Sequence, residues 1–266
     1  RNFDADARPP IAGRLGVMSL KTFQSELYGL RAPGLKLRGF VPPTPRVAVV
    51  GSRAMNRRSR EATEAIVERA AGLGFSLVSG GARGVDISAH RRALRLRMPQ
   101  LAVLPCPPEQ IYPPEFAECF DEIARRPYSG LLFGLPAGTV QTRATFASRN
   151  RLVVGLSGAT VVVQAASRSG SVGTGRLALA YPDGACAAVL GSRGCEALVG
   201  RGASSLGRPE DEGFGARVEA WLRAQLGEPV AADAQPQWPP HLRWLRDELA
   251  SADTTGRALD SFAQPL

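Results

Sequence analysis

The chain has 266 residues, of which 44% are hydrophobic, enough for a sizeable buried core. No apolar run approaches the roughly 20 residues that cross a bilayer, and the first residues lack the pattern of a signal peptide, so we expect a cytoplasmic protein that makes no membrane contact. Its four cysteines form no CxxC pair and only two histidines accompany them, so we expect no metal, cofactor or disulfide framework.

The net charge of +9 is distributed unevenly along the chain. Residues 46–206 carry 20 basic and 11 acidic side chains, whereas residues 207–266 carry 6 and 10. A basic domain attracts polyanions, which makes nucleic acid a candidate partner. The alternative explanation is genome composition, because 31 of the 33 cations are arginine, as a GC-rich genome favours.

Residues 1–45 show no sustained hydrophobic period and end in a proline-rich run, which predicts a lead-in segment with one short helix near residues 20–30. From residue 46 onward, short apolar runs alternate with amphipathic stretches. The pattern predicts strands at residues 47–50, 75–78, 101–104, 131–133, 159–164 and 185–190, and helices at residues 59–72, 85–96, 148–152 and 175–181.

Alternation of this kind predicts an α/β fold in which helices cover both faces of a parallel sheet, over residues 46–206. Residues 207–266 predict a small helical appendage, with helices at residues 214–226 and 241–249. In parallel sheets ligands bind beyond the carboxyl ends of the strands. The loops that follow the strands are therefore the candidates for a functional site.

Three loops of small residues follow predicted strands, namely Gly51–Arg53, Ser79–Gly84 and Ser169–Thr174. Small residues before a helix let backbone N–H groups approach an anion, and Arg53 adds a permanent, fork-shaped cation. The three loops together predict a phosphate-binding surface. For Arg53 alone, the alternative is a solvated loop residue.

Two polar residues follow the second loop. Asp86 is placed to cap the next helix or to accept a hydrogen bond from a neighbouring loop. His90, one turn later, has no obvious partner to activate it, so we expect a structural histidine rather than a catalytic base.

Residues 146–157 hold polar side chains against an apolar run. Arg149 and Arg151 flank Asn150, so the two arginines diverge in a helical turn and at least one of them is expected to be structural. Phe146 is either a core aromatic or a platform for a nucleobase, because stacking beside arginines is the usual basis of sequence-tolerant single-strand binding.

In this order, the motifs resemble the DprA/Smf family of bacterial DNA-processing proteins. The resemblance runs from Val47 to about Ala203 and includes Val47–Arg53, Ser79–Asp86, Ala89-His90, Tyr112-Pro113, Pro136-x-Gly138, Phe146, Arg149–Arg151, Gly155–Ser157 and Ser169–Ser171. It implies an extended Rossmann-like fold that binds and protects single-stranded DNA, forms a homodimer, and hands the strand to the recombinase RecA during natural transformation. It implies no catalysis.

The resemblance also implies which residues contact DNA. They are Gly51, Ser52, Arg53, Gly80, Arg83, Arg143, Phe146, Arg149, Asn150, Gly170, Ser171 and Thr174. Phosphate contacts of this kind supply affinity without reading sequence. The chain departs from the family pattern at Phe133-Gly134, where Ser-Glu is usual, at Ala147, where Pro is usual, and at Gln164, where Glu is usual, which indicates a divergent member.

Two other functions remain open on the sequence. Phosphoribohydrolases of the LOG type share the broader fold and use a glutamate after their glycine loop, but Leu177 stands at the corresponding position here. A module that binds or senses a nucleotide or a nucleotide derivative would use the same loops as a mononucleotide pocket.

Overall fold

The computed structural model describes residues 36–135, 138, 140–181 and 183–227. Its strands are β1 (Lys36–Gly39), β2 (Arg46–Val50), β3 (Ser76–Ser79), β4 (Gln100–Leu104), β5 (Gly130–Phe133), β6 (Ala159–Val162), β7 (Ala185–Ala188) and β8 (Ser204–Ser205). They form one sheet in the order β1-β5-β4-β3-β2-β6-β7-β8. All neighbouring strands are parallel except β1 and β5, which are antiparallel.

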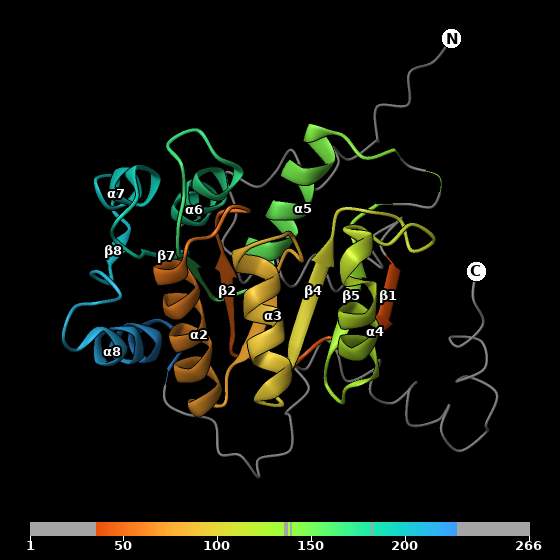
Figure 1. The fold of residues 1–266 in the computed structure, drawn as a ribbon, viewed down its shortest axis with the longest axis horizontal. Coiled ribbons are helices and arrows are strands. Elements are labelled where there is room, and N and C mark those ends of the chain that lie inside the picture. Colours follow the sequence, from red (N-terminus) through yellow and green to blue (C-terminus); the bar gives the residue numbers. More distant parts are fainter. Residues whose placement is uncertain (1–35, 136–137, 139, 182, 228–266) are drawn as a thin grey trace, which may run out of the picture.

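Helices pack on both faces of this sheet (Figure 1). They are α2 (Arg57–Gly72), α3 (Val85–Arg95), the short 3-10 helix η2 (Pro114–Phe116), α4 (Ala117–Arg125), α5 (Arg143–Gly155), α6 (Gly170–Ala180), α7 (Arg193–Val199) and α8 (Phe214–Leu226). The predicted α/β Rossmann-like fold, with a mostly parallel sheet covered on both faces, is confirmed. None of the helices in the described part of the chain combines the length and the apolar character that a membrane span requires.

The central strands alternate between two hydrophobic layers. Val47 and Val49 of β2 pack with α2, α3 and α8, whereas Ala48 and Val50 pack with α5, α6 and α7. Helix α4 covers the far end of the first layer, where Phe120 and Ile123 pack on β4 and β5. Because the strands are buried on both faces, they read in the sequence as continuous apolar runs. Their carboxyl ends all lie at the upper edge of the sheet in Figure 1.

Two helices begin earlier than the sequence pattern predicted. Helix α5 was expected from residue 148 and begins at Arg143, where the Thr142 side chain accepts a hydrogen bond from the N–H of Thr145. Helix α6 was expected from residue 175 and begins at Gly170, capped in the same way by Ser169. Hydroxyl caps satisfy the free N–H groups of a first turn, so glycine and polar residues stay helical there.

The two ends of the described chain contribute to the core more than expected. Strand β1 lies within the predicted lead-in segment and pairs with β5 at the edge of the sheet. Helix α8 has the predicted bounds, but it is packed on the core through Phe214, Val218 and Leu222. The sequence did not predict β1, β8, α4 or α7. The helices predicted near residues 20–30 and 241–249 lie outside the described residues.

Candidate functional site

The three loops predicted to bind phosphate are packed together at the carboxyl edge of the sheet. The N–H of Val85 donates a hydrogen bond to the carbonyl oxygen of Ser52 over 3.2 Å. Gly84 has a φ of 78°, and a Cβ atom on it would overlap this same carbonyl group. The hydroxyl of Ser171 donates to the carbonyl oxygen of Gly51 over 2.8 Å. The loops therefore form one continuous surface.

An exposed arginine lies over an aromatic ring on this surface. The guanidinium carbon of Arg53 is 4.9 Å from the ring centroid of Phe146. Tyr112 meets the same ring edge-on, with centroids 6.1 Å apart and an interplanar angle of 77°. Arg53 makes no ion pair with any described residue. A cation and two aromatic rings are thus presented together, an arrangement that suits a phosphate beside a stacked base.

The hollow between these side chains is small. It encloses about 20 Å³ and is lined by Arg53, Gly80, Ala82, Arg83, Pro105, Tyr112, Pro113, Phe146 and Arg149. This is room for about one water molecule, whereas pockets that enclose a small ligand have volumes of about 300–1,000 Å³. The surface suits a ligand that lies across it, which weighs against an enclosed mononucleotide.

Arg149 lies beneath this surface and is paired with a carboxylate. Its Nη1 atom is 3.6 Å from Oδ2 of Asp86, and only 5% and 6% of the two side chains are exposed. The guanidinium occupies the space where a side chain on Gly80 would lie. Burial raises the pKa of the Asp86 carboxyl, an effect that Arg149 and the N–H of Ala82 oppose. Arg149 thus holds α5 against the second loop, and its charge is neutralised there.

Three predicted site residues share one face of α5. Phe146, Arg149 and Asn150 are separated by three and four positions, which places them side by side on a helix. They differ in depth, because Arg149 is buried whereas Phe146 and Asn150 are half-buried. Arg143 is the first residue of this helix, and its side chain lies outside the described structure.

The start of α6 completes the predicted set. Gly170 is exposed, and a Cβ atom on it would lie 3.9 Å from Nδ2 of Asn150, so the first turn of α6 lies beside the middle of α5. Thr174 is buried, and its hydroxyl donates to the carbonyl oxygen of Gly170 over 3.0 Å. Thr174 therefore supports the first turn of α6 from inside.

Arg83 differs from Arg53 in having a partner on the surface. It forms an ion pair with Glu115 of η2, which lowers the pKa of that carboxyl. Neither Glu115 nor Tyr112 was predicted from the sequence as a site residue. Tyr112 carried a signal, since it lies in a motif after β4, but Glu115 is an exposed acidic residue of an ordinary kind.

Two polar residues farther inside, His90 and Gln100, are buried and contact each other. Nδ1 of His90 lies 2.7 Å from Oε1 of Gln100, and burial lowers the pKa of this histidine to about 4. Leu177 packs against the hydrophobic core, at the position where the LOG-type enzymes have their glutamate. The four cysteines are free, and no group of three or more His, Cys, Asp and Glu side chains with metal-binding geometry occurs among the described residues.

The fold and the site define a Rossmann-like α/β protein with an arginine-bearing surface, built by loops, at the carboxyl edge of its sheet. A family model described as DNA recombination-mediator protein A matches residues 35–212. The chain belongs to this family, which confirms the resemblance seen in the sequence.

Curated relatives carry the names DprA and Smf. The chain is 35% identical over 172 residues to a putative DNA processing protein DprA of Mycobacterium tuberculosis, and the match covers 62% of this chain and 43% of that protein. It is 36% identical over 135 residues to Protein Smf of Synechocystis, with coverage of 50% and 33%. The chain thus matches less than half the length of these relatives.

Two solved structures share the fold. DNA processing protein A of Streptococcus pneumoniae superposes with a TM-score of 0.61 at 28% identity, over 77% of this chain and 70% of that one. DNA processing protein A of Helicobacter pylori gives a TM-score of 0.62 at 27% identity, over 72% and 87%. The latter structure is described as revealing a single-stranded DNA binding mode.

Proposed function

We propose that this chain binds and protects single-stranded DNA, without sequence preference, across the carboxyl edge of its sheet. The observation that carries the proposal is the exposed stack of Arg53 on Phe146 beside Tyr112. Aromatic rings stack on any base, and arginine pairs with any phosphate, so affinity arises without sequence readout. The role is one of binding rather than catalysis.

The proposed contact surface is the set of residues expected from the sequence, with roles refined by burial. Arg53, Arg83 and Phe146 meet the strand directly, whereas Arg149 and Thr174 hold the elements that present them. The small loops contribute Gly51, Ser52, Gly80, Gly170 and Ser171, and α5 contributes Asn150 and Arg143. The DNA-binding structure of the Helicobacter pylori protein supports single-stranded DNA as the ligand class.

Two further parts of the proposal rest on the family resemblance. The protein acts as a homodimer, and it delivers the bound strand to RecA during recombination. Analytical ultracentrifugation of the full chain tests for the homodimer, and a monomer at all protein concentrations would contradict it. RecA filament assembly on an oligonucleotide, with and without the protein, measures the second, and unchanged assembly would argue against delivery.

The experiment that tests DNA binding is fluorescence anisotropy of a labelled oligo-dT, titrated at low and moderate salt with duplex of the same length as competitor. We expect tight binding that weakens with salt and that duplex does not compete away, because phosphate contacts release counterions. A folded sample that binds no DNA would contradict the proposal. It would favour a nucleotide ligand, and the basic charge would then reflect genome composition.

A further inference from the structure

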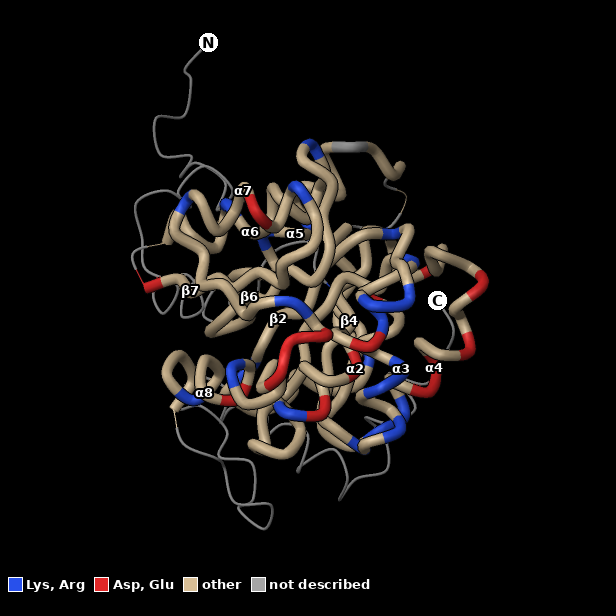
Figure 2. Tube along the Cα trace, turned by 60° about the vertical axis from the view of Figure 1, so that its left-hand side comes forward, with Lys and Arg blue, Asp and Glu red and all other residues tan. Residues whose placement is uncertain are grey.

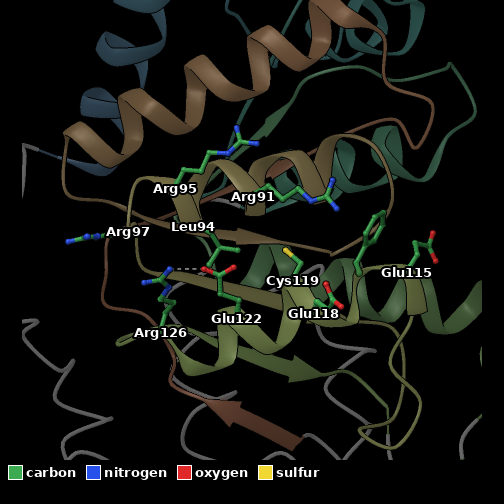
Figure 3. Close-up of a pocket in the computed structure, with 10 residues that line it drawn as sticks. Arg91, Leu94, Arg95, Arg97, Glu115, Glu118, Cys119, Glu122 and Arg126 are labelled. Carbon is green, nitrogen blue, oxygen red and sulfur yellow. Dashed lines mark hydrogen bonds and ion pairs between the residues drawn. The ribbon is translucent and has the colours of Figure 1, made fainter.

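A second hollow lies away from the three loops, between α3 and α4 (Figure 3). It has a volume of about 550 Å³. One wall carries Arg91 and Arg95 of α3, followed by Arg97, and the other carries Glu118 and Glu122 of α4. Basic residues dominate α3 and acidic residues dominate α4, as the blue and red segments of Figure 2 show. We call this hollow the α3–α4 groove.

The charges of the α3–α4 groove do not cancel. Glu122 is paired with Arg126 over 2.6 Å, and Glu115 is paired with Arg83. Among the described residues, Arg91, Arg95 and Arg97 form no ion pair, and Glu118 is the one lining carboxylate without one. Three free cations therefore face one free carboxylate, so the groove has an unpaired positive excess that suits a polyanion.

One of these cations repeats the arrangement seen at the carboxyl edge. The guanidinium carbon of Arg91 is 5.3 Å from the ring centroid of Phe116, just as Arg53 lies over Phe146. Phe116 is half-buried, and it lines the groove. An arginine stacked on an aromatic ring beside further unpaired arginines is a typical site for a base and its phosphates.

The two stacks are joined by a short segment of chain. Tyr112 touches Phe146 at one end, and Phe116 follows four positions later, at most about 14 Å along the chain. Between them Glu115 is tied to Arg83 of the second loop. A flexible strand that leaves the first stack therefore reaches the second within a few nucleotides.

We propose that the α3–α4 groove is a second binding site for the same single strand, with Phe116 and Arg91 stacking a base and Arg95 and Arg97 contacting phosphates. The inference rests on the proposed function, because it extends the strand's path from the carboxyl edge onto the outer face of α3. It assigns single-stranded nucleic acid to a surface outside the three loops.

Oligonucleotide length separates the two sites. The full chain is titrated with oligo-dT of about 4 and of about 16 nucleotides, the two ends of the usual range of site sizes. In the double variant Arg95→Gln/Arg97→Gln, we expect unchanged affinity for the short oligomer. For the long oligomer we expect weaker binding and a salt slope reduced by about 0.7 for each lost phosphate contact.

A second variant tests the stack, and a third is the matched control. Phe116→Leu keeps the apolar packing but removes the ring, and should weaken binding of the long oligomer by roughly 5- to 150-fold. Arg201→Ala removes an exposed arginine that forms no described ion pair and lies beside β8, at the other end of the sheet. This variant should leave the affinity for both oligomers unchanged.

Three results would overturn the inference. The double variant could bind the long oligomer with the affinity and salt slope of the unchanged protein. It could instead lose affinity for both lengths equally, which would place Arg95 and Arg97 in the first site or in folding. The third result is that the unchanged protein binds neither oligomer, in which case the proposed function fails as well.

Discussion

Two arginines that line the hollow beside Phe146 have opposite environments. Arg53 is exposed, lies over the ring of Phe146 and makes no ion pair with a described residue. Arg149 is buried beneath the same surface and is paired with Asp86. A buried guanidinium requires a carboxylate because the interior does not solvate it, and an exposed one does not. Because both residues are arginines, burial decides which of them stabilises the fold and which remains available for an anion.

The largest expected effect tests the buried member of this comparison. Asp86→Ala leaves Arg149 buried without its carboxylate, which should lower the free energy of unfolding by about 3–5 kcal/mol. Urea denaturation measures this. The matched control is Arg53→Ala, which should leave the unfolding midpoint nearly unchanged because no described partner is lost. Equal effects of the two variants would refute the distinction.

The affinity for DNA tests the proposed role of exposed Arg53 and of the Phe146 ring beneath it. Phe146→Ala should weaken oligo-dT binding by about 1–3 kcal/mol through the loss of base stacking, with the salt slope preserved. Arg53→Ala should instead reduce the salt slope by about 0.7, because one phosphate contact is lost. Anisotropy titrations at several salt concentrations separate the two effects. Identical slopes in Arg53→Ala and the unchanged protein would remove Arg53 from the interface.

Acid should destabilise the buried region through His90. Burial lowers its pKa from 6.5 to about 4, so the unfolded chain binds a proton between these values that the folded chain excludes. The contribution of this group to the free energy of unfolding is therefore fully present above about pH 6.5. Between about pH 6.5 and about pH 4, the free energy of unfolding falls by about 1.4 kcal/mol for each pH unit. Urea midpoints of the unchanged protein and His90→Gln, from about pH 7 to about pH 5, should converge as the pH falls. If the urea midpoints of the two proteins instead stayed a constant distance apart over this pH range, the pKa of His90 would be the same in the folded and unfolded chains.

The smallest expected effect concerns Arg83, which is intermediate between the two arginines. Its exposed partner Glu115 competes with a phosphate for the same guanidinium. Glu115→Gln should therefore tighten oligo-dT binding modestly and steepen the salt slope by about 0.7. The matched control is Glu212→Gln, because this exposed carboxylate forms no described ion pair and lies just before α8, outside the three loops and the α3–α4 groove. A similar gain in both variants would point to a general charge effect.

Much of the fold could be predicted because the central strands are buried on both faces. Continuous apolar runs located β2, β3, β4, β5, β6 and β7, and the amphipathic period located α2, α3 and α8. The pattern did not reveal β1, which is a partly exposed edge strand with the sequence Lys-Leu-Arg-Gly. Nor did it reveal the true starts of α5 and α6, since hydroxyl caps rather than apolar spacing fix them.

The loops that form the candidate site could be predicted from the sequence, but the burial of each side chain in them could not. The positions of Arg53, Gly84 and Phe146 after strands or at a helix start were enough to bring them to one edge. The sequence predicted that at least one arginine beside Asn150 is structural. It could not show that Asp86 is the partner of Arg149, because that contact joins residues 63 positions apart through the tertiary fold.

The contact between Ser52 and Gly84 has a consequence for the speed of capture. The first two loops touch backbone to backbone, and the hydroxyl of Ser171 bonds the third loop to the first. If the surface binds DNA as proposed, we therefore expect no closing step after a strand arrives. Association should then be a single event whose observed rate rises linearly with DNA concentration, without a plateau, and falls with salt as long-range steering is screened. A protein built in this way can bind a strand that is exposed only briefly.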